Sequence, residues 1–353
     1  MDVVLHIGPH KTGSTYIQHA LAGNRGALEG EGVVYPTFGI PPKMHGHHSL
    51  AHEADIYLAP EQIAKLKTEI GERERVAFSA EGLCNWSNQN FTAFADLLGA
   101  SRVLLVYYLR DPFDQFYSYW KERVKQGQLQ SLPEWFMENF GDPHRSFVLN
   151  PLVHLRRYRE LDERFELRLI PYETLRTRGE DIVQPLWREV LEIPNGFATP
   201  DERQNRSLST EATEFLRMLI DRYLARNPGV AGRVVRHAFT RQTRSWWLFR
   251  KSNLVAEAEA AMETYAAGLS RTLSVSRQCN FYRSLIDQLQ KDFAGSLVGT
   301  DGSSLYDQDE SHLEYYDRAD LMSLAPLAEA IEGIATRIER SRFVETAPAE
   351  QVV

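Results

Sequence analysis

The sequence predicts an α/β protein built on a doubly wound, mostly parallel sheet, with flanking helices and a helical C-terminal region. Short apolar runs typical of buried strands alternate with amphipathic stretches typical of helices between residues 3 and 175. Each strand run is followed by a helix start, which is the pattern of βαβ units with parallel strands. After about residue 200 the strand signal weakens and helical patterns dominate.

Strands are expected where β-branched, leucine and aromatic residues follow one another. These strands are Val3–Ile7, a short extended piece Val33–Pro36, Val76–Ser79, Arg102–Leu109 and Phe165–Ile170. Helices are expected between them, where apolar residues recur at helical spacing. These helices are Thr15–Gly23, Glu61–Glu72, one that opens at Pro112, Asn150–Leu161 and a helical region that opens at Pro171–Leu175.

The first strand leads through a loop with a lysine and a glycine into a helix start. The segment reads Leu5-His6-Ile7-Gly8-Pro9-His10-Lys11-Thr12-Gly13-Ser14-Thr15. The first N–H groups of a helix lack intrahelical partners and lie at the positive end of the helix dipole, so they suit an anion. Gly13 allows a close approach, and Lys11 adds a positive charge. Ser14 and Thr15 add hydroxyl donors. We therefore predict a P-loop-like phosphate cradle.

A second strand-to-helix junction follows the strand Arg102–Leu109. Asp111 suits the helix N-cap, Pro112 the first helical position, and Asp114 the capping-box acid. Capping explains neither Arg110 at the end of the strand nor Ser118 two turns into the helix. An arginine fork is well suited to a phosphate dianion.

Together, these two junctions resemble the nucleotide-binding segments of sulfotransferases that use 3′-phosphoadenosine 5′-phosphosulfate (PAPS). A Walker A loop has its lysine directly after the second glycine, whereas Lys11 precedes Gly13. The form H-K-T-G-S-T is instead similar to the loop that holds the 5′-phosphate of PAPS. The resemblance implies that Lys11, with His10 as a helper, stabilises the leaving oxygen. It places the 5′-phosphate on Thr12, Gly13, Ser14 and Thr15.

The pattern L-R-D-P-x-x-x-x-x-S resembles the segment that grips the 3′-phosphate of PAPS, which implies this role for Arg110 and Ser118. The resemblance covers the N-terminal half well and the rest thinly. It implies PAPS as the sulfuryl donor, PAP as the product and no metal ion. The absence of a membrane span makes a soluble bacterial-type member the better comparison.

Two residues compete for the role of general base. Glu81 follows the strand Val76–Ser79, and many carbohydrate-type members carry a catalytic glutamate after such a strand; a helix-start acid or a solvated strand end is the alternative. His48 lies in the histidine-rich stretch 45–52, and related bacterial chains have a histidine segment there that lines the acceptor pocket. An imidazole titrates near neutrality, so His48 is a serious rival. The stretch alone is weak evidence for zinc.

The composition excludes several classes of protein. A net charge of −8 over 353 residues argues against a general nucleic-acid binder. Two distant cysteines, Cys84 and Cys279, form no metal or disulfide spacing and fit a reducing cytoplasm. No run approaches the roughly 18 apolar residues of a membrane span, and no secretory signal precedes the first strand. We expect a cytoplasmic protein.

We expect the α/β core at residues 1–200, a mainly helical part at 201–344 that completes this domain or caps the acceptor site, and a disordered tail at 345–353. The segment 222–251 is rich in arginine around Trp246-Trp247. It is either a solvated face or part of a wall that binds an anionic ligand.

The sequence thus predicts an enzyme that moves the sulfuryl group of PAPS to the hydroxyl of a carbohydrate or small metabolite. One alternative is a P-loop small-molecule kinase, with Asp111 as its Walker B acid and a need for Mg²⁺. The other is a nucleotide-binding module without catalysis. The sequence indicates neither the acceptor nor the oligomeric state.

Overall fold

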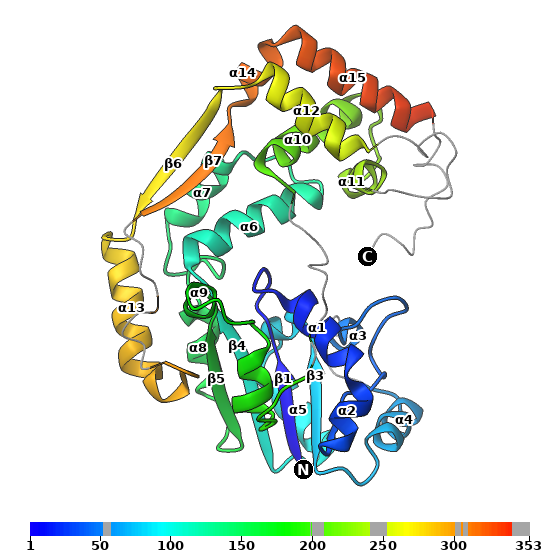
Figure 1. The fold of residues 1–353 in the computed structure, drawn as a ribbon, viewed down its shortest axis with the longest axis vertical. Helices are drawn as coiled ribbons and strands as arrows, with labels where there is room; N and C mark the ends of the chain where they lie inside the picture. Colours follow the sequence, from blue (N-terminus) through cyan, green and yellow to red (C-terminus); the bar gives the residue numbers. More distant parts are fainter. Residues whose placement is uncertain are drawn as a thin grey trace. The chain divides into compact units, whose positions relative to one another are not determined.

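The structure, a computed structural model, describes residues 1–51, 58–197, 199, 208–240, 253–300, 305 and 310–340. It divides into two compact units, each made from three stretches of chain (Figure 1). Unit 1 comprises Met1–Gln115, Pro143–Arg206 and Arg277–Asp309. Unit 2 comprises Phe116–Asp142, Ser207–Ser276 and Glu310–Val353. The units therefore interleave along the sequence and do not follow one another.

Unit 1 is built on a five-stranded sheet in which every pairing is parallel, with strand order β2-β3-β1-β4-β5. Its strands are β1 Asp2–His6, β2 Val33–Val34, β3 Arg75–Ser79, β4 Arg102–Leu109 and β5 Phe165–Pro171. After β3 the chain crosses β1 to form β4, so the strand order reverses between β1 and β4. Ligands of open α/β sheets bind at such a reversal, beyond the carboxyl ends of the strands.

Helical segments lie between the strands of unit 1 and after the sheet. They are α1 Ser14–Gly23, α2 Arg25–Gly30, α3 His48–Ala51, α4 Pro60–Ile70, η1 Glu81–Asn85, α5 Asn88–Leu98, α8 Leu152–Tyr158, α9 Tyr172–Thr177, η2 Leu186–Val190, α13 Asn280–Phe293 and η3 Ala294–Ser296. A further helix, α6 Pro112–Lys125, begins in unit 1 and continues into unit 2.

Successive strand residues point to opposite sides of the sheet, so both faces carry side chains. Helices cover both faces. One face packs on α1, α2, α9 and η2 in a core that includes Val4, Leu104, Ile170, Ile17, Leu28, Leu175 and Trp187. On the other face, Phe78 of β3 meets Phe94 of α5 with ring centroids 5.2 Å apart. There too, Tyr107 of β4 lies 6.5 Å from the ring of His154 in α8.

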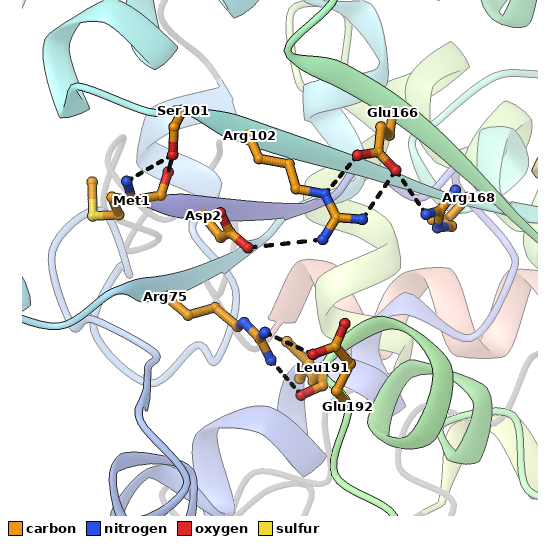
Figure 2. A network of polar contacts seen from close by, with 9 residues as sticks. All are labelled: Met1, Asp2, Arg75, Ser101, Arg102, Glu166, Arg168, Leu191 and Glu192. Atoms are coloured by element: carbon orange, nitrogen blue, oxygen red, sulfur yellow. Dashed lines mark hydrogen bonds and ion pairs between the residues drawn. The ribbon is translucent and has the colours of Figure 1, made fainter.

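A network of charged side chains joins the strands at the amino edge of the sheet, opposite the edge where ligands are expected (Figure 2). Arg102 lies between two acids, with Asp2 Oδ2 at 3.8 Å and Glu166 Oε1 at 2.5 Å. Arg75 donates to the carbonyl oxygen of Leu191 at 2.7 Å. These ion pairs are partly exposed, so each contributes little to stability, but they match the parallel register of β1, β4 and β5.

Unit 2 combines helices with a two-stranded antiparallel sheet. Its elements are the rest of α6, α7 Leu132–Phe140, α10 Thr210–Arg226, α11 Gly232–Thr240, α12 Leu254–Tyr265, β6 Ser270–Ser276, β7 Glu310–Tyr316, α14 Arg318–Ser323 and α15 Ala325–Arg340. The long helix α10 is buried along most of its length. Within it, Glu214 and Arg217 form a buried ion pair of 2.7 Å.

The structure confirms the predicted α/β class and the parallel sheet. The C-terminal part is mainly helical, as expected, but it also contains the β6–β7 pair, which we did not predict. Only Leu273 and Val275 are apolar in Ser270–Ser276, and the partner strand is distant in sequence, so no local pattern indicates this pairing. The predicted helix Asn150–Leu161 is shorter, spanning Leu152–Tyr158.

Two further predictions concern segments that the structure describes in part or not at all. The expected tail 345–353 lies outside the described residues, as does the stretch 241–252 with the two tryptophans. At the start of the arginine-rich segment, Arg222 and Arg226 of α10 pair with Glu332 of α15 at 3.0 and 2.6 Å. These two arginines therefore have carboxylate partners within unit 2.

Candidate functional site

The loop that follows β1 is hydrogen-bonded to the carboxyl end of the neighbouring strand β4. Beyond β1, the N–H of Ile7 donates to Val106 of β4 at 3.0 Å, and the N–H of Tyr108 donates to Gly8 at 2.8 Å. On the other side, Ala80 after β3 donates to His6 at 3.1 Å. The start of the β1–α1 loop is thereby held between the ends of β3 and β4.

The β1–α1 loop, residues 7–13, turns tightly through three residues with positive φ, Gly8 (86°), Lys11 (70°) and Gly13 (83°). A side chain at Gly13 would be strained, because φ is positive there and a Cβ would lie 2.3 Å from Cδ1 of Ile182. The hydroxyl groups of Thr12 and Ser14 donate to the carbonyl oxygen of Pro9 at 2.6 and 3.3 Å. Thr12 is fully buried, so its hydroxyl serves the loop itself.

Two side chains from the junction between β4 and α6 donate hydrogen bonds to carbonyl groups of the β1–α1 loop. Arg110, directly after β4, donates from Nη1 to the carbonyl oxygen of Lys11. Gln115 in α6 donates to that of His10 at 3.0 Å. In a trans peptide the C=O and N–H bonds point in opposite directions. The next N–H groups, of Lys11 and Thr12, are thus turned away from Gln115 and Arg110, and successive N–H groups beside a left-handed residue suit an anion.

Arg110 also lies against two residues at the start of α9. Its Nε is 3.8 Å from Oε1 of Glu173, and its guanidinium carbon is 5.3 Å from the ring centroid of Tyr172. Burial raises the pKa of Glu173 to about 8, an effect that Arg110 opposes and Asp111 reinforces. At neutral pH this carboxyl is therefore largely protonated, and Glu173 compensates the charge of Arg110 only in part.

Asp111 is a structural hub. Its Oδ1 accepts from the N–H groups of Phe113 and Asp114 at 3.0 and 3.1 Å, which confirms the predicted N-cap of α6. Its Oδ2 accepts from Arg277 at 3.0 Å and from the hydroxyl of Tyr282 at 2.5 Å. We expected Asp114 to accept the capping-box hydrogen bond from the N–H of Asp111. Glu173 accepts this hydrogen bond instead, at 2.9 Å.

Glu81 opens η1 directly beside the β1–α1 loop. A Cβ on Gly8 would lie 2.9 Å from both Cα and Cβ of Glu81, so the two backbones touch. The carboxylate accepts a hydrogen bond of 2.8 Å from Gln18 of α1 at Oε2, and its Oε1 is 3.9 Å from Nδ1 of His10. Burial alone would raise the pKa of Glu81. The nearby charges of His48 and His10, with the hydrogen bonds, outweigh it and lower this pKa.

The histidine-rich stretch is anchored by its middle residue. His47 is fully buried, accepts from the N–H of Ser79 at 3.0 Å through Nδ1, and contacts the carbonyl of Pro36 through Nε2 at 3.1 Å. Burial lowers the pKa of His47 to about 3, so it is neutral. This anchor places the next residue, His48, at the start of α3. Helix α3 packs on η1, since a Cβ on Gly82 would lie 2.8 Å from Cβ of Ala51.

Most of the predicted site residues therefore gather at one edge of the sheet in unit 1. These are His10, Lys11, Thr12, Gly13, Ser14, Thr15, His48, Glu81 and Arg110. Ser118 belongs to α6 but falls in unit 2, so its role at the 3′-phosphate stays a prediction. The sequence analysis missed Gln18, Gln115 and Glu173. Glutamine has no spacing signal of its own, and nothing local in the sequence pairs these residues with the loop.

Among the described residues, no group of three or more His, Cys, Asp and Glu side chains has a geometry that could hold a metal ion. Over the same residues, no helix combines the length and the apolar character needed to cross a membrane.

The fold and this site define the class of the protein: an α/β protein with a five-stranded parallel sheet and clustered polar residues at its carboxyl edge. Comparisons with known proteins found no match among family models, curated proteins or solved structures.

Proposed function

We propose that this protein is a PAPS-dependent sulfotransferase. The observation that carries the proposal is the hydrogen bond from Arg110 to the carbonyl of Lys11, combined with the approach of Glu81 to His10 in the same loop. A lysine loop, a helix start, an arginine and a carboxylate are thereby grouped at one edge of the sheet. This is the set of groups that sulfuryl transfer from a doubly phosphorylated nucleotide requires.

In the proposed reaction an acceptor hydroxyl attacks the sulfur of PAPS in line. The bond between sulfur and the oxygen of the 5′-phosphate breaks, and PAP leaves with the electron pair. Charge develops on that oxygen, and Lys11, helped by His10, stabilises it. The N–H groups of the P-loop-like cradle, Thr12 to Thr15, bind the 5′-phosphate. Arg110 binds the 3′-phosphate.

The proton of the acceptor goes to Glu81 or to His48. Glu81 is the better supported base, because its backbone packs on Gly8 and its carboxylate is held by Gln18. A base must be fixed within hydrogen-bonding reach of the proton that it removes. The acceptor is a hydroxyl of a carbohydrate or small metabolite, and the reaction needs no metal ion.

The alternative of a P-loop kinase is less well supported. It requires Asp111 to act as the Walker B acid that helps to hold Mg²⁺. Both oxygens of Asp111 already accept hydrogen bonds, from the start of α6 and from Arg277 and Tyr282. A metal role would break contacts that hold α6 and α13 in unit 1.

The direct test compares ligands by calorimetry and thermal shift. PAP stabilises the folded state by mass action, whereas AMP, which lacks the 3′-phosphate, should bind at least about tenfold more weakly. Transfer is then measured with PAPS and a panel of hydroxylated acceptors, by mass spectrometry of the added sulfuryl group. Equal affinities for PAP and AMP contradict the proposal. So does activity that EDTA abolishes and Mg²⁺ restores.

A further inference from the structure

Gln18 is buried in the second turn of α1, with its side-chain amide at the junction of three segments. It is 3% exposed and donates from Nε2 to Oε2 of Glu81 at 2.8 Å. On its other side the histidine-rich stretch passes at Gly46, where a Cβ would lie 2.4 Å from Cδ of Gln18. One amide thus contacts both Glu81 and the segment that leads to His48.

The two oxygens of Glu81 have different surroundings because of this contact. Oε2 accepts from the buried amide of Gln18, and Oε1 lies 3.9 Å from Nδ1 of His10, whose side chain is 43% exposed. The backbone of Glu81 cannot shift toward the loop, because Gly8 is already in contact with it. The carboxylate is therefore fixed at its backbone and at one oxygen.

We propose that Gln18 is a positioning residue that holds Oε2 of Glu81 and leaves Oε1, on the side of His10, as the oxygen that accepts the proton. The assignment of Oε1 as proton acceptor rests on the proposed function. The hold on Oε2 does not. A general base loses efficiency when its acceptor atom is misplaced, and displacement by about 1 Å can cost on the order of 100-fold in rate.

The first test is the titration of the Glu81 carboxyl by ¹³C NMR in Gln18→Met and Gln18→Glu, with the full chain. Groups that face this carboxylate are Gln18 from α1, His10 from the β1–α1 loop, His48 from α3 and the backbone N–H of Glu81 itself. The buried side chains of His6, Tyr35 and Cys84 also interact with its charge. Loss of a donor to the charged form raises the pKa of Glu81 in Gln18→Met. In Gln18→Glu, two neighbouring carboxyls share a proton, so the higher of their two apparent pKa values rises further.

Gln115→Met is the matched control. Gln115 is also a buried glutamine, 8% exposed, but its amide donates to the carbonyl of His10 and not to Glu81. The pKa of Glu81 should shift less in this variant than in Gln18→Met, because Gln115 can act on Glu81 only through His10. Equal titration of Glu81 in the wild type, Gln18→Met and Gln18→Glu overturns the proposal. Because Gln18→Glu keeps the shape of the side chain, it preserves the test if Gln18→Met does not fold.

The second test measures turnover. With saturating PAPS, kcat of Gln18→Met falls about 10- to 100-fold, and the Kd for PAP stays within about threefold of wild type. The acidic limb of the pH–rate profile moves upward together with the pKa of Glu81. If the wild type transfers no sulfuryl group, the proposed function fails, and the NMR titration still decides whether Gln18 holds Glu81. Unchanged kcat and pH profile in an active Gln18→Met enzyme refute the positioning role.

Discussion

The guanidinium of Arg110 donates a hydrogen bond to the carbonyl oxygen of Lys11, 99 residues earlier in the chain. This contact joins the end of β4 to the loop after β1, at the point where the strand order of the sheet reverses. Arg110 thus has a second role besides the phosphate contact that we propose. It fixes the loop whose N–H groups would bind the 5′-phosphate.

Arg110→Ala should therefore weaken the binding of PAP by about 1.5–3 kcal/mol, or about 10- to 150-fold, through loss of a charge-assisted contact. AMP should lose affinity too, though less, because the loop is no longer held. Calorimetry with both nucleotides measures the two effects. Arg102→Ala is the control, since Arg102 begins the same strand at the opposite edge of the sheet. Normal PAP affinity in Arg110→Ala would remove Arg110 from the site.

Lys11→Ala should reduce turnover more than it reduces PAP affinity. Its charge is needed most when the oxygen that leaves sulfur becomes negative, so the loss appears chiefly in kcat. The left-handed backbone at Lys11 is unfavourable for alanine, so Lys11→Asn, which tolerates φ 70°, should be measured beside it. Near-normal kcat at saturating PAPS in both variants would exclude Lys11 from the mechanism.

The local parts of this site could be predicted from the sequence, and the contacts between its parts could not. Asp111 is recognisable as an N-cap because the cap bonds run to Phe113 and Asp114, two and three residues away. Its partners Arg277 and Tyr282 are more than 160 residues away. No periodicity or spacing connects such positions, because the packing of α13 in unit 1 brings them together.

The same distinction applies to the fold. Apolar runs reveal β1, β3 and β4 of the central sheet, since these strands are buried on both faces. The strands β6 and β7 are half exposed, carry few apolar residues and pair across an intervening segment of unit 1. Gln18 and Gln115 illustrate the limit for the site. Each lies in a helix that the sequence predicts, but its partner is set by tertiary packing.

Arg277→Met should destabilise the protein strongly. Arg277 and Asp111 are 4% and 1% exposed, and removal of the arginine leaves the Asp111 carboxylate buried with less compensation. Loss of one member of a buried pair typically costs about 3–5 kcal/mol. Urea unfolding of Arg277→Met measures this change in the free energy of unfolding. Arg164→Met, which breaks partly exposed pairs with Asp162 and Asp96, should cost much less. Equal costs would contradict the assigned role of Asp111.

His47 should make the protein sensitive to acid. Burial lowers its pKa in the folded state to about 3, whereas the unfolded chain has the ordinary value of 6.5. The unfolded state therefore takes up the proton first. The full contribution of His47 to stability is present above pH 6.5 and is lost as the pH falls toward 3, at up to about 1.4 kcal/mol per pH unit.

The measurement is the Tm between pH 7 and pH 4.5 in the wild type and in His47→Gln. Glutamine does not titrate, so the Tm of His47→Gln should fall less steeply with acid than that of the wild type. At pH 7 the Tm of the variant should be lower than that of the wild type. His6 is also buried, its pKa is lowered to about 4, and it adds a slope of the same sign in both proteins. If the Tm of His47→Gln falls with pH as steeply as that of the wild type, His47 is not the source of the acid sensitivity.

The last prediction concerns the general base. Glu81→Gln keeps the shape of the side chain but cannot accept the proton, so kcat should fall by roughly 10²–10⁴ while PAP binding stays nearly unchanged. His48→Ala should be milder and act through acceptor affinity. Wild-type turnover in Glu81→Gln would favour His48 over Glu81 as the general base.

The pH–rate profile separates the two candidates, because the surroundings of Glu81 lower its pKa below the ordinary 4.5. A base works only when it is deprotonated, so with Glu81 in this role the rate stays flat from pH 8 to about 5 and falls only below 4.5. If His48 is the base instead, the acidic limb of the profile would vanish in His48→Ala. Glu81 is the base that we expect. Gly8 and Gln18 fix its backbone and one oxygen, and this rigidity compensates for its weak basicity.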